Sequence, residues 1–576
     1  MSRLFTILLL WMTAGPILYA QSSVSLEIKS EQDLPIQFPL NTPIKSEFEI
    51  QTGLRDYIKQ LNEIGYLSAS IDSMTGDSIT RIAHLFVGTK YEWTQLHTDS
   101  VDEEILSRTG FRDKQYVNKP FSAKQVNRFF LDALSLLENT GYPFAEIKLG
   151  YVSINSNQVE ATVLLKKNKF YKIDSIEIIG EDTRLNRHYI ENVIHLKKSH
   201  PYDERIIRQI SNRIQEDPYM AELKPYEVLF TPNTCKIILI LKPKKANVFD
   251  GIIGFQPQPD NDGLVLTGDI KISLGNIIGQ GERLNLRWQR LQDETQQIDA
   301  GIHVPFLFKT PFGLGYDLNI YRRDTTFNNV HHRFTIPFRL DNGSEFQGFF
   351  DNFSTSLIST FNYENSTAIP PYNDAENRLY GLGYLAAFVA NKFNPYSGWM
   401  ISINGGAGTN KILRNSALEL VEYDSINLES TLLQGQLKLS YFQPISSQTT
   451  LLAQVNTSVK QSTNLTENQA FRMGGLLSLR GFDEQSIFAS SYVIGTLEYR
   501  LLFDRNSRIS VFYDFAWYEL ATITRFVTDT PHGFGAGITF GTQAGMFSLN
   551  YAIGTQQGNP INFRTGKIHF GFVNLF

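Results

Sequence analysis

The second half of the chain alternates between apolar and polar residues, and this pattern limits the fold more than any other feature. From about residue 246 onward, segments such as Leu264–Leu274 and Leu433–Tyr441 place apolar side chains at nearly every second position. Such alternation predicts strands with one apolar and one polar face. A soluble sandwich turns its apolar face to a core, whereas a membrane barrel turns it to lipid, so alternation alone leaves both open.

Three further features favour the barrel. The alternation continues over residues 246–576, which exceeds the usual size of a sandwich domain. The Phe and Tyr residues of this segment crowd the apolar faces and strand ends, as aromatic girdles do at membrane interfaces. About sixteen candidate strands fit this segment, since a strand needs only about ten residues to cross a membrane. We therefore expect a transmembrane antiparallel β-barrel over residues 246–576.

The N-terminus supplies the compartment. Arg3 precedes the apolar run Leu4–Met12, and Leu18-Tyr19-Ala20 forms an acceptable cleavage site before Gln21. This arrangement predicts a secretory signal peptide over residues 1–20, the alternative being a short buried helix.

Composition excludes several classes of function. Cys235 is the only cysteine, so an internal disulfide framework is excluded and a cysteine-ligated metal site is not expected. The net charge of −5 offers no basic surface for nucleic acid. His331-His332 has no acidic or cysteine neighbours at ligand spacing, and no nucleophile–base constellation stands out. We expect neither an enzyme nor a metal or other cofactor.

The first half contains a threefold repeat. Tyr66, Tyr142 and Tyr219 lie within similar segments, at spacings of 76 and 77 residues. An amphipathic helix precedes each tyrosine, and alternating strands follow it. The third helix is expected to run through Ile206, Ile207, Ile210 and Ile214. A strand before each helix and two after it predict three small α+β domains, at residues 21–91, 92–168 and 169–245.

Three such units on a secreted chain resemble tandem POTRA (polypeptide-transport-associated) domains. Three unrelated adaptor domains are the alternative. POTRA sheets have exposed edges, to which an unfolded client chain can add a strand.

The segment Gly474–Phe482 carries the most specific resemblance. Its Leu479-Arg480-Gly481-Phe482 is similar to the Val-Arg-Gly-Phe/Tyr loop of the BamA/TamA and two-partner-secretion transporter superfamily, with Leu479 in place of valine. The resemblance implies that this loop folds into the barrel lumen and that its arginine meets acidic residues of the barrel wall.

Strand parity identifies the acidic partners. Phe512-Tyr513-Asp514 resembles the family's Phe-x-Asp-x-Gly strand, although Ala516 replaces the glycine. Alternation turns Phe512 and Asp514 to the lumen, and Glu498 lies on the polar side of the preceding strand. Arg480 is therefore expected to pair with Asp514 and Glu498.

Two other segments fit the same resemblance. Phe570, Phe572 and Phe576 alternate on the last strand, like the terminal signal that recruits barrel proteins for insertion. Gly275–Glu282 is expected to be an early periplasmic turn. This glycine-rich segment superficially resembles a phosphate-binding loop. We reject that interpretation, because a phosphate-binding loop must begin a helix and a strand follows here.

The resemblance implies a function in assembling, inserting or translocating proteins, and three POTRA-like domains before about sixteen strands look most like TamA. The expected partners are unfolded outer-membrane protein clients, outer-membrane lipid and an inner-membrane or periplasmic protein. The barrel is expected in the outer membrane, with the N-terminal domains in the periplasm. Export of one dedicated exoprotein is the alternative. The barrel would close between Phe249–Gln256 and Lys567–Phe576, and the resemblance implies that this seam opens for clients.

Overall fold

The computed structural model describes residues 25–575, apart from residues 38–46, 78–79, 182–183, 233, 258–263, 291–294, 309, 341, 362, 365, 390–393, 477, 505–506, 543–544 and 560–565. The predicted signal peptide and Phe576 lie outside the described residues. Within these ranges, no helix has the length and apolar character needed to span a membrane.

The first N-terminal domain is one helix on a three-stranded sheet. Its elements are β1 (Ser25–Lys29), α2 (Glu47–Glu63), β2 (Ser70–Gly76) and β3 (Thr80–Phe86), with the sheet order β1-β3-β2. Leu54, Tyr57 and Leu61 recur at helical spacing along α2 and are buried. They pack towards Ala83 and Leu85 of the central strand, so the predicted amphipathic face forms the core.

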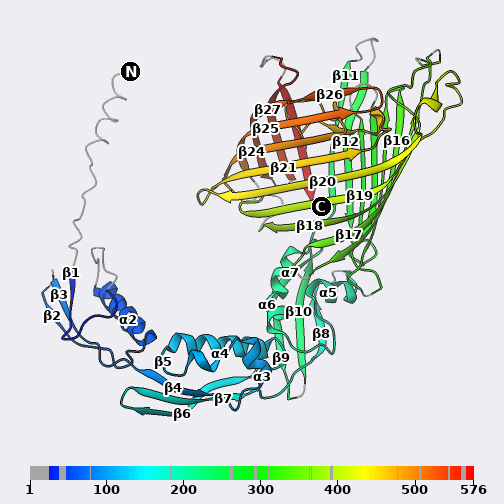
Figure 1. Cartoon of the computed structure of the whole chain (residues 1–576). Coiled ribbons are helices and arrows are strands. Elements are labelled where there is room, and N and C mark those ends of the chain that lie inside the picture. The colour runs from blue at the N-terminus through cyan, green and yellow to red at the C-terminus, as the bar shows by residue number, and fades with distance from the viewer. Residues whose placement is uncertain are drawn as a thin grey trace, which may run out of the picture. The chain divides into compact units, whose positions relative to one another are not determined.

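The second domain repeats this design with one additional strand (Figure 1). Its elements are β4 (Glu92–His97), α3 (Glu103–Arg108), η1 (Asp113–Gln115), β5 (Lys119–Pro120), α4 (Ala123–Glu138), β6 (Glu146–Asn155) and β7 (Gln158–Lys166). The sheet order is β5-β4-β7-β6, which leaves β6 at one edge. Ser122 caps α4 by accepting a hydrogen bond from the Gln125 amide at 3.3 Å.

The third domain departs from the sequence prediction in its helices. Its elements are β8 (Ile173–Gly180), α5 (Arg187–Ile194), α6 (Glu204–Arg208), α7 (Ile210–Glu216), β9 (Met220–Phe230) and β10 (Cys235–Pro243). The prediction of one helix through Ile206–Ile214 is wrong, because Gln209 separates α6 from α7. Helix α5 was not predicted. The apolar run Ile237–Leu241 lies on the central strand of the order β8-β10-β9, where its residues are buried or partly buried.

The C-terminal half is a large antiparallel sheet (Figure 1). Its strands are β11 (Val248–Pro257), β12 (Leu264–Gly275), β13 (Arg283–Arg290), β14 (Gln296–Val304), β15 (Leu314–Arg323), β16 (Phe327–Arg339), β17 (Glu345–Leu357), β18 (Ala375–Val389), β19 (Gly398–Ile412), β20 (Glu429–Pro444), β21 (Thr449–Gln461), β24 (Ser491–Leu502), β25 (Arg508–Ala521), β26 (Phe526–Asp529), β27 (His532–Thr542), β28 (Gly545–Thr555) and β29 (Lys567–Leu575). Among the described residues this is one strand more than the roughly sixteen expected, because the short β26 pairs with the end of β25 beyond the part that pairs with β27.

The sheet closes into a barrel through β11 and β29. Among the described residues, these two strands pair at Val248↔Leu575 and Phe249↔Asn574, whereas β18 and β19 pair along their full length. The seam is therefore short compared with its neighbours.

The two faces of the barrel wall follow the alternation. Five bulky residues of β25 are 39–53% exposed on the outer face: Ile509, Val511, Tyr513, Phe515 and Trp517. Between them, Ser510, Phe512 and Asp514 are at most 5% exposed and face inward. This arrangement confirms the predicted apolar-out pattern.

Candidate functional site

The predicted lumen loop lies between β21 and β24. It carries a short hairpin, β22 (Phe471–Met473) paired with β23 (Ile487–Ala489), and the Gly474–Phe482 motif joins these two strands. Leu479 and Phe482 are buried in an apolar cluster with Ala516 and Tyr518 of β25. Because Ala516 shares its parity with Asp514, the loop packs on the inner face of the wall. Ala516 is fully buried there, where the family pattern has glycine.

Arg480 contacts both of the expected carboxylates. Its Nε and Nη2 atoms donate to Asp514 Oδ2 and Oδ1 at 2.8 and 2.7 Å, and Nη1 donates to Glu498 Oε2 at 2.6 Å. The Arg480 backbone amide also donates to Asp514 Oδ2, at 3.2 Å. The guanidinium therefore uses its fixed fork on Asp514 and has one further donor for Glu498.

The wall holds both carboxylates in place. Asp514 is fully buried and accepts a further hydrogen bond from Thr496 Oγ1 at 2.8 Å. Glu498 is 4% exposed and also accepts from Arg500 Nε at 2.8 Å. The Arg480 guanidinium carbon lies 3.4 Å from the Phe512 ring centroid, so the aromatic face covers the cation. The two carboxylates thus face the two arginines within one buried cluster.

Glycines allow the loop backbone to touch the wall backbone. Gly481 has φ +97°, and a Cβ there would lie 2.6 Å from the Gly554 nitrogen. A Cβ on Gly554 would in turn lie 2.6 Å from the Gly481 oxygen, and one on Gly533 would overlap the Arg480 oxygen. Side chains at these positions would move Arg480 away from its partners.

A network of amides anchors the start of the loop and was not predicted. It surrounds the single turn η3 (Glu467–Gln469). Gln469 Nε2 donates to Asn377 Oδ1 at 3.0 Å and to Asn410 Oδ1 at 2.6 Å. Asn468 Nδ2 donates to Thr355 Oγ1 at 2.7 Å. These partners lie on β17, β18 and β19, so the loop has a second attachment, far along the chain from the Arg480 strands.

The early turn Gly275–Glu282 lies between β12 and β13 and contacts α5 of the third N-terminal domain. The Asn186 amide donates to the Gly279 oxygen at 2.6 Å, and a Cβ on Gly281 would overlap the Tyr189 ring. Tyr189 Oη donates to the buried Asp217 at 2.6 Å, and burial raises the pKa of that carboxyl. The turn therefore leaves space for the Tyr189 ring, because Gly281 has no side chain.

The remaining sequence candidates are placed as follows. Phe570 and Phe572 lie on β29, where their backbones pair with Leu549 and Phe547, and Phe576 lies outside the described residues. His331 and His332 are neighbours on β16, so their side chains point to opposite faces. In the part of the chain that the structure describes, no three His, Cys, Asp or Glu side chains gather as a metal site requires.

Comparison with known proteins agrees with this architecture. A model of the Omp85 superfamily domain matches residues 276–574. CdiB from Escherichia coli is similar at a TM-score of 0.54 and 13% identity, over 92% of this chain and 97% of that chain. CdiB from Acinetobacter baumannii is similar at a TM-score of 0.53 and 13% identity, over 92% and 96%. BamA from Haemophilus ducreyi lacking POTRA domains 1-3 gives a TM-score of 0.45 at 14% identity, over 84% and 99%.

At these identities, the structural likeness shows the fold alone. No curated protein matches the chain. The family model covers more than half of the chain and includes the loop, Glu498 and Asp514. The chain belongs to the Omp85 superfamily.

Proposed function

We propose that this protein assembles, inserts or translocates other proteins at the outer membrane, without catalysing a covalent reaction. The observation that carries the proposal is the Arg480 loop, which is fastened inside the barrel to Asp514 and Glu498. The barrel would lie in the outer membrane, in contact with its lipid, and the three N-terminal domains would lie in the periplasm. Their boundaries would fall near residues 91, 168 and 245.

The N-terminal domains would receive unfolded clients at a sheet edge. Strand β6 is the outer strand of its sheet, and the register shift between Gly150 and Ser153 marks a bulge. Beside this bulge, Tyr151 is 82% exposed and Val152 is 52% exposed. An added client strand would find backbone hydrogen bonds and an apolar surface there, with little demand on its sequence. Such a site suits a protein with many clients.

The seam between β11 and β29 would be the exit towards lipid. Only two residue pairs are described between these strands, so a client strand would have few backbone contacts to replace here. In lipid, each backbone group that is released must find another partner, and a client strand supplies those partners. Gly251 within β11 weakens that strand further.

Export of one dedicated exoprotein is the alternative function, because the same fold serves both. The outer-membrane proteome of a depletion strain separates them. Assembly predicts that many barrel proteins decrease together. Export predicts an unchanged set of barrel proteins and the loss of one secreted protein. If neither set changes, the proposed function is wrong.

A cross-linking experiment tests the route of the client and finds any inner-membrane or periplasmic partner. A photoreactive residue at Val152 of β6 should cross-link unfolded barrel segments in cells. The same residue at Leu131 is a matched control, because Leu131 is an apolar side chain, 58% exposed, on helix α4 of the same domain. Equal cross-linking at both positions would contradict capture at the edge.

A further inference from the structure

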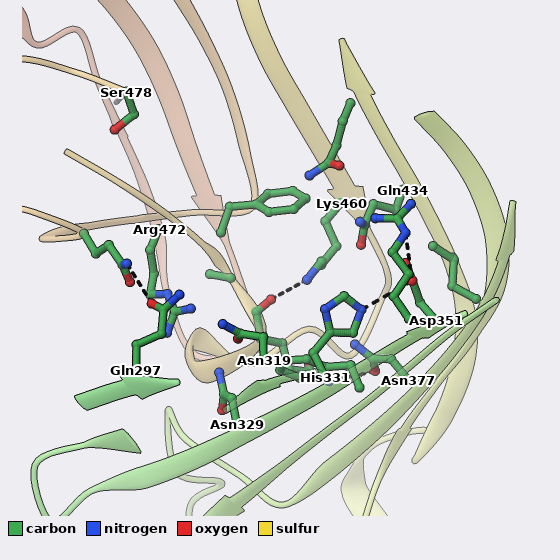
Figure 2. A pocket seen from close by; sticks show the side chains of 18 of the residues that line it. Gln297, Asn319, Asn329, His331, Asp351, Asn377, Gln434, Lys460, Arg472 and Ser478 are labelled. Atoms are coloured by element: carbon green, nitrogen blue, oxygen red, sulfur yellow. Dashed lines mark hydrogen bonds and ion pairs between the residues drawn. The ribbon is translucent and has the colours of Figure 1, made fainter. Parts of the chain in front are cut away.

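A cavity of about 410 Å³ lies inside the barrel beside the loop, apart from the Arg480 cluster (Figure 2). Polar side chains from β13 to β18 and from β20 line much of it, and β21 and β22 contribute Lys460 and Arg472. Its arginine and lysine residues are Arg287, Arg333, Lys460 and Arg472, and its carboxylates are Asp351 and Glu484. The described lining thus has more cations than anions.

Lys460 and Arg472 have no carboxylate within 4.0 Å among the described residues. Lys460 is 9% exposed, and its ammonium donates to the Gln469 backbone oxygen at 2.6 Å. The guanidinium carbon of Arg472 lies 3.3 Å from the Tyr321 ring centroid, and its buried Nη1 atom has no hydrogen-bond partner. An unpaired buried donor on a cation is costly, and an anion in the cavity would remove that cost.

The two carboxylates of the lining are engaged elsewhere. Asp351 Oδ1 lies 3.4 Å from both His331 Nε2 and Arg333 Nε, so it is shared between two basic groups as an ion pair, although neither contact is a hydrogen bond. Glu484 accepts a hydrogen bond from the Leu476 amide of its own loop at 3.2 Å. Among the described residues, neither carboxylate lies within 4.0 Å of the Lys460 ammonium or the Arg472 guanidinium.

We propose that this cavity binds an oxyanion, a phosphate or carboxylate group, between Lys460 and Arg472. Lys460 supplies a point charge, and Arg472 supplies its unpartnered Nη1 group, with the guanidinium backed by the Tyr321 ring. The amide side chains Asn319, Asn329 and Asn377 add neutral hydrogen-bonding groups around the site, as Figure 2 shows. The Lys460 ammonium donates a hydrogen bond to the Gln469 backbone oxygen at the start of the loop. An anion that holds Lys460 would therefore also stabilise the loop in its lumenal position.

The test uses the full-length protein folded in detergent, titrated calorimetrically with inorganic phosphate at constant ionic strength set by chloride. Wild type should bind phosphate saturably. Lys460→Gln and Arg472→Gln should each weaken binding about tenfold, the effect of losing one charged hydrogen bond. Lys438→Gln is the matched control, because Lys438 lies on the polar face of β20 and outside the lining. It should bind as wild type does.

A second arm replaces phosphate with a hexaglutamate peptide and distinguishes a free ion from the acidic side chains of a polypeptide. Tighter binding of the peptide assigns the site to polypeptide carboxylates, and binding of phosphate alone assigns it to a free ion. The absence of saturable binding of both probes to wild type would overturn the proposal. An equal loss in Lys438→Gln would also overturn it, because it would show a diffuse field. If one cavity variant fails to fold, the wild-type isotherm and the other variant still decide.

Discussion

Truncating Arg480 to alanine is the perturbation that tests the loop anchor most directly. The change removes two donors to Asp514 and one to Glu498, at 2.6–2.8 Å. Asp514 is fully buried and, among the described residues, would keep the Thr496 hydroxyl and the backbone amide of residue 480 as donors. Glu498 would keep Arg500. Asp514 therefore loses most from the change.

The magnitude follows from this burial. Removing one partner of a buried ion pair costs about 3–5 kcal/mol, since the other charge stays desolvated. The two remaining donors on Asp514 place the expected loss in the free energy of unfolding near the lower end, at about 3 kcal/mol. Asp514→Ala should cost a similar amount, because Arg480 then keeps Glu498 alone. Arg480→Lys should lie between wild type and Arg480→Ala, as lysine keeps the charge and loses the fork.

The assay is urea unfolding of the detergent-folded protein, followed by the heat-modifiable mobility of the barrel and by tryptophan fluorescence. The double variant Arg480→Ala/Asp514→Ala should be less destabilised than the sum of the single variants, by about 2 kcal/mol, because both remove the same interaction. Client assembly should be impaired in each single variant. The amide network should keep the loop attached, so the barrel should still fold.

Strictly additive losses would refute the reasoning, even if each single variant were defective. Wild-type stability and activity in Arg480→Ala would mean that the contact of Arg480 with Asp514 and Glu498 contributes neither to folding nor to function.

Three further predictions use the same unfolding assay or the yield of folded barrel. Gly281→Ala should destabilise the protein by about 1–3 kcal/mol more than Gly558→Ala, because the two glycines share φ values of +70° and +69° and only Gly281 faces a ring, that of Tyr189; equal effects would mean that the ring does not need the space. Gln469→Ala should cost about 1–3 kcal/mol, because two buried amide oxygens lose their donor, and an unchanged urea midpoint would contradict this. Deleting Phe576 should lower the amount of heat-modifiable barrel in membranes, whereas an unchanged yield would show that the terminal residue is incidental.

The sequence predicted side-chain orientation best within strands, because successive side chains of a strand point to opposite faces. On β25, alternation alone put Asp514 inward and Tyr513 outward, and their exposures are 0% and 44%. The same rule put Glu498 on the polar side of β24. The pairing with Arg480 then needed only a loop that enters the lumen, which the family resemblance supplied.

Other features could not be predicted, because nothing local encodes them. Asn468 donates a hydrogen bond to Thr355, which is 113 residues away in the sequence. Neutral amides have no charge, so the sequence does not indicate which partner each of them takes. The break between α6 and α7 at Gln209 falls within an apolar pattern that is continuous in sequence, so tertiary packing decides it. The space for the Tyr189 ring depends on the absence of a side chain at Gly281, and only the folded structure shows that this ring fills it.

The glycine contacts between loop and wall have a consequence for how this protein tolerates mutation. At Gly481, Gly533 and Gly554, a backbone atom lies within 2.6 Å of the place that a Cβ would take, and the glycines themselves contribute no chemical group whose loss a substitution could reveal. The requirement is for empty volume, and every other amino acid violates it to some degree. A saturation-mutagenesis screen should therefore find these positions almost uniformly intolerant, with alanine nearly as harmful as larger residues. Arg480 should instead show a graded response, with lysine the mildest replacement.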